Sequence, residues 1–496
     1  MVPPRDCLRP HPRACRSCRA QPLNILTAMG DPALFGPHFP GESWRAWRVF
    51  LRSLFALDMD ASDLALFQHH TARTVSPTAP FREAALICGR RGGKSRVLAF
   101  VAVYLACFRD YSAHLAPGEV ATVAVIAADR RQARIILRYV TGALRSIDLL
   151  RPMIEEEATE SVTLTNRVVI EVATASFRVT RGYTFAAVLA DEVAFWRSDD
   201  SANPDAEIVA AVRPGLSSIP GAMLLLASSP YSKRGVLYSV FKRHYGRDDA
   251  RVLVWRGTTT EMNPGIDPAI IAEAFDDDPA SAAAEYGGQF RDDVSGFVTR
   301  EVIDGCTVPG RYELPRLSVH RYHAFVDPSG GSSDAMTLAV GHAERDGAGL
   351  NAPTRAVLDL VREVRPPFSP EAVVADFAAV LKSYGIARVV GDRYGGEWVR
   401  EPFRKHGISY DLADRPKSDL FRDVLPLLNS GRAELLDLPK LAAQFVGLER
   451  RVARGGRDSI DHPPGAHDDI ANAAAGALLL TVGAGASVAD RWRALA

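Results

Sequence analysis

Apolar runs of strand length alternate with longer, helix-like runs over the first half of the chain. The short runs predict buried strands, and the longer runs predict helices that cross from one strand to the next. Segment 162–174 has the alternation of a β-hairpin instead. This order indicates an α/β fold with a mostly parallel sheet. The predicted strands are 83–89, 121–128, 186–192 and 222–230, and the predicted helices are 96–108 and 130–144.

A second alternation begins at Arg321 and has a different order. Three strand-length runs follow one another directly, then come a helix, a strand and a helix, and the last strong pattern is a helix at 468–482. This layout is typical of an RNase H-like domain. The preceding segments are, in order, 322–330, 335–344, 355–364, 369–385, 387–392 and 397–407, with 408–414 and 421–431 as a further strand and helix.

The regions outside these two alternations have weaker patterns. Residues 42–60 predict one amphipathic helix with Trp44, Trp47, Phe50 and Leu51 on the same face. The chain before it is rich in Pro and Arg and looks unpacked, and the segment between the alternations reads as short helices rather than a sheet. We therefore predict a flexible leader at 1–40, a first domain at 41–257, a helical connector at 258–316, a second domain at 317–485 and a tail at 486–496.

Size and charge narrow the class of protein. A chain of 496 residues is too long for one core, which agrees with two domains. The formal net charge is +0, so any contact with nucleic acid would come from local basic patches. No run of about 18 apolar residues lacks charges, and the N-terminus has no apolar h-region. We expect neither a membrane span nor a signal peptide.

The six cysteines do not form a disulfide framework. Three stand singly and are interpreted as small buried apolar residues in a reducing compartment. Three lie near the start, where a C-x-x-C pair resembles half of a zinc site. No second pair completes it, so a basic leader is preferred, and Met29 is an alternative start. The single cysteines are Cys88, Cys107 and Cys306, and the clustered ones are Cys7, Cys15 and Cys18, beside His11.

The segment C-G-R-R-G-G-K-S has the composition of a phosphate-binding loop and lies between a predicted strand and helix, the context that a P-loop requires. Glycines let backbone N–H groups point inward towards phosphate. Lys94 would reach the β- and γ-phosphates, and Ser95 would bind Mg²⁺. A tight strand–helix turn is the alternative, and the pattern lacks the usual first glycine, which is Cys88. The predicted nucleotide-contacting residues are Gly89, Arg90, Arg91, Gly92, Gly93, Lys94 and Ser95.

Two carboxylates, Asp191 and Glu192, end a later apolar strand. Asp191 would hold Mg²⁺, and Glu192 would orient and deprotonate the attacking water. Ser228-Ser229-Pro230 closes the next strand, where polar groups would sense the γ-phosphate, although this is also ordinary turn chemistry. Candidates for an arginine finger, with surface ion pairs as the alternative, are Arg90, Arg91 and Arg181.

Carboxylates also mark the second alternation. Asp327 ends its first strand, Asp392 ends its fourth, and Asp468 and Asp469 open the final helix. Clustered acids can hold two Mg²⁺ or Mn²⁺ ions, which activate water and stabilise the leaving oxygen in phosphodiester hydrolysis. Either residue of the last pair could instead cap the helix. We favour Asp469 for metal because Asn472 lies on its face. Lesser candidates are Asp334, His467 and Asp359.

The ordered set GRRGGKS, VLADE, SSP, VDPSGG, VVGDRYGG and HDDIANA resembles the large terminase subunit of tailed bacteriophages and prophages, over about Trp44 to Val482. The resemblance implies a P-loop (RecA/ASCE-like) ATPase domain followed by an RNase H-like nuclease domain. It implies adenine contacts near Trp44 and Trp47. The family's ATP site is matched by Lys94, Ser95, Asp191 and Glu192, and its metal-binding acids by Asp327, Asp392 and Asp468 or Asp469.

The resemblance further implies ATP-driven translocation of double-stranded DNA into a viral procapsid and metal-dependent endonucleolytic cutting of concatemeric DNA. ATP with Mg²⁺ would serve the first site, and Mg²⁺ or Mn²⁺ the second. The expected partners are double-stranded DNA, the portal protein and the small terminase subunit. The chain would be monomeric in isolation and form a homo-oligomeric ring, a pentamer, on the procapsid portal in the cytoplasm of the bacterial host.

Three other interpretations stay open. A helicase-like or repair ATPase-nuclease would act on free DNA and would carry helicase motifs in a second RecA-like domain. A packaging scaffold with dead sites would lack Lys94, Glu192 and the spaced acids. A degraded prophage or gene-transfer-agent protein would still package DNA. Asn472 stands where the family often has an acid, so the nuclease would be weaker if that position binds metal.

Overall fold

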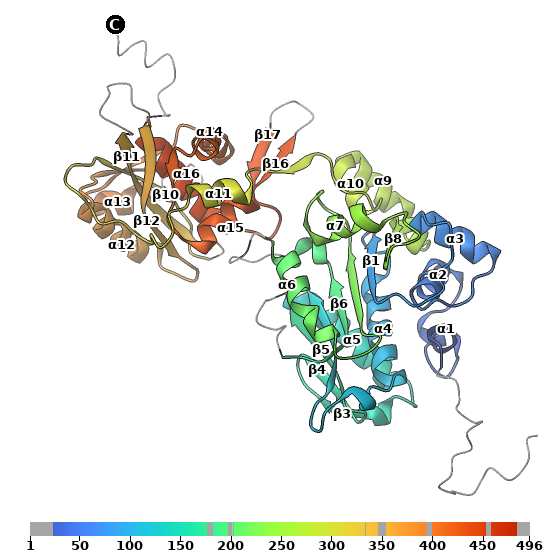
Figure 1. The fold of residues 1–496 in the computed structure, drawn as a ribbon. Helices are drawn as coiled ribbons and strands as arrows, with labels where there is room; N and C mark the ends of the chain where they lie inside the picture. Colours follow the sequence, from blue (N-terminus) through green and yellow to red (C-terminus); the bar gives the residue numbers. More distant parts are fainter. Residues whose placement is uncertain are drawn as a thin grey trace, which may run out of the picture.

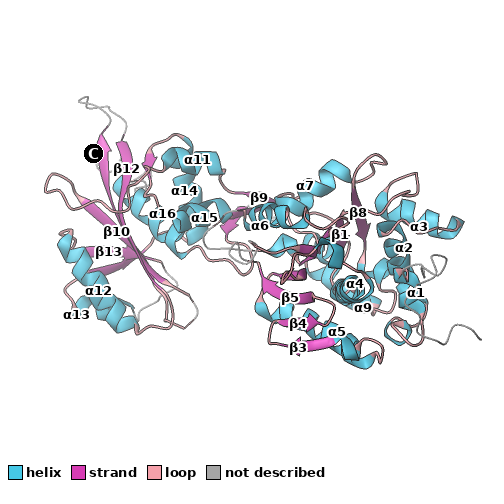
Figure 2. Cartoon of the chain, turned by 60° about the horizontal axis from the view of Figure 1, so that its bottom comes forward, coloured by secondary structure: helices cyan, strands magenta, loops and turns pink. Residues whose placement is uncertain are grey.

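The computed structural model describes residues 23–175, 182–196, 201, 203–332, 334–345, 354–392, 399–452 and 458–483. It consists of two lobes (Figures 1 and 2). The larger lobe contains the first alternation of the sequence and the smaller lobe contains the second. No helix among these residues has the length and apolar character needed to cross a membrane. Cys7, His11, Cys15, Cys18 and Arg181 lie outside the described residues.

The large lobe is built on an eight-stranded sheet in the order β3-β4-β5-β2-β6-β7-β1-β8. The strands from β5 to β8 in this order are parallel, and β3, β4 and β5 form an antiparallel edge that contains the predicted hairpin. Because β7 lies between β1 and β6, the core has the order of RecA/ASCE-like P-loop ATPases. The strands are β1 (Glu83–Cys88), β2 (Ala121–Ala127), β3 (Ile154–Glu157), β4 (Ser161–Leu164), β5 (Val168–Thr174), β6 (Phe185–Asp191), β7 (Met223–Ser228) and β8 (Val252–Gly257).

The helices that cover this sheet are buried to an extent that depends on how apolar they are. The helix α4 (Lys94–Phe108) is apolar on most sides and is almost wholly buried behind the sheet. The helix α5 (Arg130–Ser146) buries one stripe and exposes its arginines. On the opposite face of the sheet, α6 (Pro204–Val212) and α7 (Gly235–His244) bury their apolar residues.

The predicted helix over 42–60 is shorter than expected. Residues Glu42–Trp44 form a 3₁₀ turn, and α2 ends at Leu54 because Ala56 takes a left-handed backbone conformation with φ of 50°. A separate helix, α3 (Ala61–Thr71), then starts at Asp60, whose side chain accepts hydrogen bonds from the first turn. The sequence shows the amphipathic face of α2 (Arg45–Leu54) but not this break.

The prediction that residues 1–40 are an unpacked leader is wrong for residues 23–40. Helix α1 (Ile25–Gly30) begins at Asn24, which caps it, and buries Met29. Phe35 is buried and packs edge-on against Phe100 of α4, with ring centroids 4.7 Å apart. These side chains belong to the core of the large lobe.

The small lobe contains a six-stranded sheet in the order β14-β13-β10-β11-β12-β15. The first three strands along the chain are antiparallel neighbours, and β13 and β14 add in parallel on the far side of β10. This is the RNase H-like strand order, as predicted, with β15 added at the edge. The strands are β10 (Tyr322–Asp327), β11 (Met336–Arg345), β12 (Thr354–Val364), β13 (Arg388–Gly391), β14 (Ser409–Leu412) and β15 (Ala433–Glu434).

Helix α16 (Asp469–Thr481) is the buried helix of this lobe. Its small residues let it approach the sheet closely, and Gly476 lies so near β10 that an added Cβ would come within 2.3 Å of the Phe325 ring. The other helices of the lobe are α12 (Pro370–Ser383), α13 (Arg400–Lys405), α14 (Lys417–Asn429) and α15 (Pro439–Gly447).

The predicted connector is not purely helical. After α8 (Thr259–Met262), α9 (Pro268–Asp277) and α10 (Pro279–Glu285), the short strand β9 (Val294–Gly296) pairs with β16 (Glu449–Val452). With β17 (Asp458–Asp461), they form a three-stranded sheet between the lobes, and α11 (Arg300–Cys306) leads on to the small lobe. The sequence missed these strands because charged residues fill β16 and β17.

Candidate active sites

The phosphate-binding pattern lies where β1 meets α4. Gly93 has φ of 101°, a left-handed conformation that favours glycine, and Lys94 is the first residue of α4. Lys94 is 5% exposed. Its Nζ donates to the Cys88 carbonyl at 2.9 Å and to Ser229 Oγ at 3.0 Å. The side chain of Cys88 is buried, and burial raises the pKa of its thiol to about 12. Cys88 is therefore a neutral, buried residue at the end of β1.

The carboxylate of Asp191 meets this loop from the end of β6. Ser95 Oγ donates to Asp191 Oδ2 at 3.1 Å, and the other oxygen, Oδ1, is buried with no hydrogen-bond partner among the described residues. Burial, and then the charge of Glu192, raises the pKa of Asp191 to about 7, although Lys94 and Ser95 oppose the shift. A hydroxyl beside an under-satisfied carboxylate is a donor set that suits Mg²⁺.

Glu192 adopts a left-handed conformation with φ of 51°, which directs it away from the strand. Its Oε2 accepts hydrogen bonds from Ser228 Oγ at 3.0 Å and from the Ser229 N–H at 3.1 Å, and its Oε1 lies 3.3 Å from Lys94 Nζ. Burial tends to lower the pKa of Lys94, but the carboxylates of Glu192 and Asp191 outweigh it and raise that pKa. The acid pair, the lysine and the Ser228–Ser229 turn therefore form one connected group.

A cavity of about 420 Å³ opens beside this group. Arg91, Lys94, Ser95 and Glu192 line it, and so does Trp44. Trp47 is different, because it is fully buried and its indole N–H donates to the Gly92 carbonyl at 2.9 Å. Of the two tryptophans expected near the adenine, Trp44 can reach a ligand and Trp47 supports the loop from below.

Residues that follow β8 form hydrogen bonds with the phosphate-binding loop. These contacts were not predicted from the sequence. Thr259 Oγ1 donates to the Arg90 carbonyl at 2.8 Å, and Asn263 Nδ2 donates to the Arg91 carbonyl at 2.9 Å. Arg90 pairs with Glu285 at 3.0 Å, which favours the ion-pair interpretation for that arginine in this conformation. The supposed connector therefore begins as part of the large lobe.

The second acidic group gathers at the carboxyl ends of β10 and β13. Asn472 on α16 donates from one Nδ2 to Asp327 Oδ2 at 2.9 Å and to Asp392 Oδ2 at 3.0 Å. Burial raises the pKa of Asp327 well above its usual value, as do the charges of Asp469, Asp392 and Asp468, while the Asn472 hydrogen bond opposes the rise. The three elements and the place of Asn472 beside Asp469 were predicted, but the bridge that Asn472 makes between the two carboxylates was not.

Asp468 and Asp469 have different surroundings. Asp468 forms an ion pair with Lys417 at 3.0 Å, and Lys417 also binds Asp461. Asp468 occupies the N-cap position of α16, but its side chain accepts no capping hydrogen bond, so the capping alternative is wrong for that side chain. Burial and the charge of Asp468 raise the pKa of Asp469 to about 6. Lys417 therefore neutralises Asp468, whereas the partner of Asp469 is the His467 imidazole, whose Nδ1 lies 4.0 Å from Asp469 Oδ2.

This acidic group fits divalent cations. The Asn472 Oδ1 atom is buried and has no hydrogen-bond partner among the described residues. An orphaned oxygen beside carboxylates with raised pKa values indicates that a positive charge belongs there. Asp334 and His467 lie at its rim, 3.9 Å apart, and are more exposed. Asp359 lies elsewhere, because it is buried against His342 at 2.7 Å.

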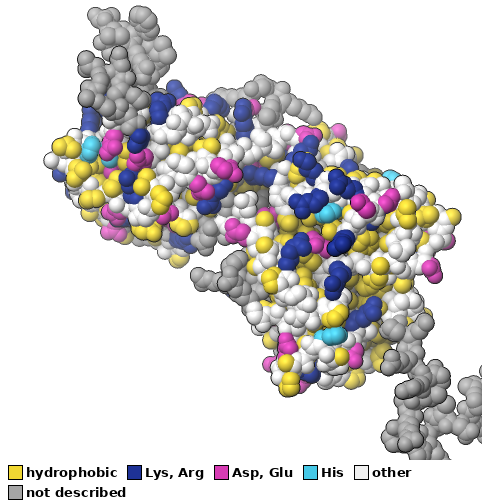
Figure 3. Space-filling view, in the orientation of Figure 1, with side chains coloured by type: hydrophobic (Ala, Val, Ile, Leu, Met, Phe, Trp, Pro, Cys, Tyr) yellow, Lys and Arg dark blue, Asp and Glu magenta, His cyan; other side chains and the backbone are white. Residues whose placement is uncertain are grey.

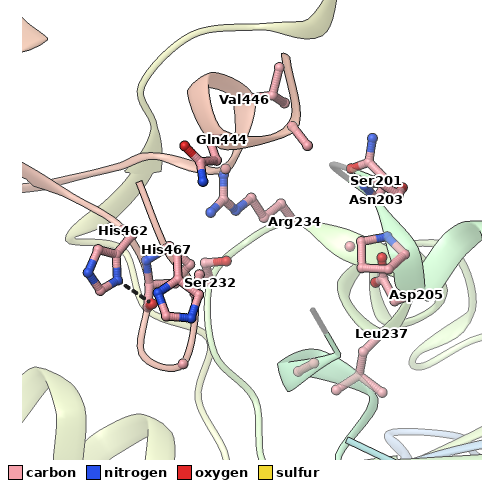
Figure 4. Close-up of a pocket in the computed structure, with 18 residues that line it drawn as sticks. Ser201, Asn203, Asp205, Ser232, Arg234, Leu237, Gln444, Val446, His462 and His467 are labelled. Carbon is pink, nitrogen blue, oxygen red and sulfur yellow. Dashed lines mark hydrogen bonds between the residues drawn. The ribbon is translucent and has the colours of Figure 1, made fainter. Parts of the chain in front are cut away.

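A cavity of about 410 Å³ lies between the lobes (Figure 4). Ser232 and Arg234 line it from the segment after β7, and Gln444, His462 and His467 line it from the small lobe. Close by, Arg234 pairs at 2.7 Å with Glu449, which is fully buried and also accepts a 2.7 Å hydrogen bond from the Tyr231 hydroxyl. The segment that follows the Ser228–Ser229 turn is thus bonded directly to β16.

Comparison with known proteins gives one family match. Residues 86–296 match the family model described as "Terminase large subunit, T4likevirus-type, N-terminal". The structure is similar to the large terminase of bacteriophage HK97, with 16% identity, a TM-score of 0.37 and coverage of 87% of this chain and 99% of that chain. No curated protein matches the sequence.

Two other solved structures are similar. The large terminase of the thermophilic bacteriophage D6E has 14% identity, a TM-score of 0.37 and coverage of 83% of this chain and 96% of that chain. The magnesium-bound large terminase nuclease of the thermophilic phage G20c has 19% identity, a TM-score of 0.28 and coverage of 36% of this chain and 95% of that chain. The family match over β1 to β9 indicates that this part of the chain is the N-terminal domain of a large terminase subunit.

Proposed function

We propose that this protein is a DNA-packaging motor that hydrolyses ATP to move double-stranded DNA into a viral procapsid and cuts concatemeric DNA with its second lobe. The observation that carries the proposal is the pairing of two built acidic sites in one chain. One places Lys94, Ser95, Asp191 and Glu192 around a cavity beside a phosphate-binding loop. The other gathers Asp327, Asp392 and Asn472 in an RNase H-like sheet.

In the first site, each side chain has a distinct role in ATP hydrolysis. Lys94 would exchange its hydrogen bonds to the loop carbonyls for bonds to the β- and γ-phosphates, and Ser95 and Asp191 would hold Mg²⁺, which would supply positive charge beside the phosphates. Glu192 accepts a proton from the attacking water. Because Glu192 is bonded to Ser228 and Ser229, loss of the γ-phosphate alters the turn that ends β7.

In the second site, Asp327, Asp392 and Asp469 would hold Mg²⁺ or Mn²⁺, and the bound ions would supply an activated water and stabilisation of the leaving oxygen. Asn472 donates hydrogen bonds to both Asp327 and Asp392 and so holds these two carboxylates close together. Lys417 holds Asp468 in its ion pair, so Asp468 shapes the site without being an equal ligand.

Contact with DNA is supported by local basic surfaces on a chain of zero net charge. Lys and Arg side chains gather on the large lobe (Figure 3). Helix α5 exposes Arg130, Arg134 and Arg138, and α7 ends in Lys242 and Arg243. Such rows neutralise backbone phosphates without reading sequence.

The packaging role also requires partners and a place. We include in the proposal the portal protein and the small terminase subunit as partners, and a ring of five copies that forms on the procapsid in the bacterial cytoplasm. A repair or helicase-like ATPase would place a second RecA-like sheet where this chain has an RNase H-like one.

The proposal is tested by separating the two activities. Lys94→Ala should lower ATP hydrolysis by at least about 100-fold while Mn²⁺-dependent plasmid cutting persists. Asp327→Ala should abolish cutting while ATP hydrolysis persists. Lys382→Ala and Asp376→Asn, both at exposed positions of α12, are the matched controls and should change neither activity.

Two results would contradict the assignment. ATP hydrolysis that survives Lys94→Ala would remove the loop from the nucleotide site, and cutting that survives Asp327→Ala would remove Asp327 from the nuclease. Packaging itself is measured by DNase protection of DNA in purified procapsids, with both variants failing to protect full-length DNA.

A further inference from the structure

A second cluster of possible ligands lies in the small lobe, away from the nuclease acids. It is formed by His320, His342, Glu344 and Asp359. His342 on β11 is opposite Tyr322, the first residue of β10, whereas Asp327 is the last residue of that strand. At about 3.3 Å per residue, the cluster is therefore roughly 16 Å from the nuclease acids along the strand.

The imidazole of His342 is held in one orientation by a buried carboxylate. His342 is 3% exposed and Asp359 is 1% exposed, and both oxygens of Asp359 lie within hydrogen-bond distance of His342 Nδ1, at 2.7 and 2.9 Å. This contact leaves Nε2 for Glu344, whose Oε1 lies 3.2 Å away. A carboxylate behind the Nδ1 of a histidine is the arrangement that orients metal-binding imidazoles.

His320 completes the group from a different part of the chain. It precedes β10, and its ring centroid is 4.1 Å from that of His342. One ligand atom each from His320, His342 and Glu344 lies within 4.8 Å of the others. Small adjustments of two partly exposed side chains would bring all three to the bonding distances of a single ion.

We propose that His320, His342 and Glu344 bind one Zn²⁺ ion, with Asp359 as the hydrogen-bonded support of His342. Two imidazoles and one carboxylate are ligands that suit zinc, and the fourth position would be filled by water. The ion joins the segment that enters β10 to the end of β11. It thereby fixes the chain that arrives from the ATPase lobe onto the nuclease sheet.

Two other clusters lack this arrangement. In the group His69, His70 and Glu261, the glutamate already accepts the hydrogen bond of a capping box from Thr258. In the group around Asp468, the ammonium of Lys417 occupies the position of a cation. The cluster around His342 has neither feature.

The proposal is tested by titrating the EDTA-treated, dialysed full-length protein with ZnCl₂ in an isothermal calorimeter. Millimolar MgCl₂ and an Asp327→Asn background suppress zinc binding at the nuclease acids. One zinc ion should bind. Asp359→Asn should weaken it about 10–100-fold, and Glu344→Gln and His320→Gln should weaken it more. His323→Ala is the matched control, because the alternation of β10 puts His323 on the opposite face from Tyr322.

Co²⁺ provides a second readout. Its visible absorption should have the intensity of a four-coordinate site in the parent protein and in His323→Ala, and should be lost in Glu344→Gln. Glu344 and His320 lie towards the surface, so their variants keep the fold even where His342→Ala does not. Absence of zinc binding, or binding that is unchanged in Glu344→Gln, would show that the cluster is an ion pair only and would overturn the proposal.

Discussion

Replacing Asp469 with asparagine should make the metal-free protein more stable, although it removes a proposed metal ligand. Burial raises the pKa of Asp469 from 3.8 in the unfolded chain to about 6. At 1.36 kcal/mol for each pKa unit, this difference is worth about 3 kcal/mol. The side chain is 14% exposed, so solvent screens it little. The carboxylate is a cost to the folded state, and Asp469→Asn should recover up to about 3 kcal/mol.

The pH dependence gives the sign of this effect. A carboxyl group whose pKa is higher in the folded state binds more protons there, so it lowers stability as pH rises from about 4 to 6. The cost is complete above pH 6 and vanishes below about pH 4. Asp469→Asn should therefore stabilise the protein at pH 7.5 and have little effect at pH 4. Mg²⁺ should reverse the order, because it binds the parent protein more tightly than the variant.

Hydrogen exchange measured by mass spectrometry suits this test, because unfolding of two lobes need not be a single transition. Peptides from β10 and α16 should exchange more slowly in Asp469→Asn than in the parent protein at pH 7.5 in EDTA. Asp376→Asn, at an exposed site on α12, is the control and should leave exchange unchanged. Faster exchange in Asp469→Asn under these conditions, or an equal gain at pH 4, would refute the reasoning.

Two further variants and one pH profile test other parts of the structure. Gly476→Ala drives a Cβ into the ring of Phe325 and should destabilise the small lobe by about 1–3 kcal/mol in thermal unfolding, and an unchanged melting temperature would contradict the close packing of α16. Because the pKa of Asp191 is about 7, a proton competes with Mg²⁺ there, so the KM for Mg-ATP should rise as pH falls from 8 to 6; a flat profile would argue against Asp191 as a ligand. Glu449→Gln removes the charge that Arg234 binds and should weaken contact between the lobes by about 1.5–3 kcal/mol, seen as faster exchange in α7 and β16, and unchanged exchange there would show that the pair is energetically neutral.

Local sequence carries enough information to predict the elements that bear the two acidic sites. The apolar runs before Cys88, Asp191 and Asp327 are buried strands, and their polar residues come at the carboxyl ends, where parallel strands meet. The glycines before Lys94 mark the turn because only a residue without a side chain takes φ of 101° at low cost. Fold class and most of the candidate site follow from such local signals.

Contacts between distant segments were not predictable in this way. The ion pair of Lys417 with Asp468 joins two helices that are far apart in sequence, and it distinguishes two adjacent aspartates that look equivalent. Strand β16 contains Glu449, Arg450 and Arg451, a composition with no strand pattern, and it is stabilised by pairing with β9 and β17. The packing of Phe35 on α4 likewise depends on tertiary contacts that a Pro-rich segment does not reveal.

The two acidic sites share one physical property. Asp191 Oδ1 and Asn472 Oδ1 are both buried oxygens without a hydrogen-bond partner in the described structure, and both lie beside carboxyl groups whose pKa values are raised. A fold under selection for stability alone would satisfy these atoms or replace them with apolar groups. Their retention costs free energy in the metal-free protein, and a bound cation would recover it in both lobes. This free-energy cost therefore falls at the positions where ATP hydrolysis and DNA cutting would each need a divalent cation.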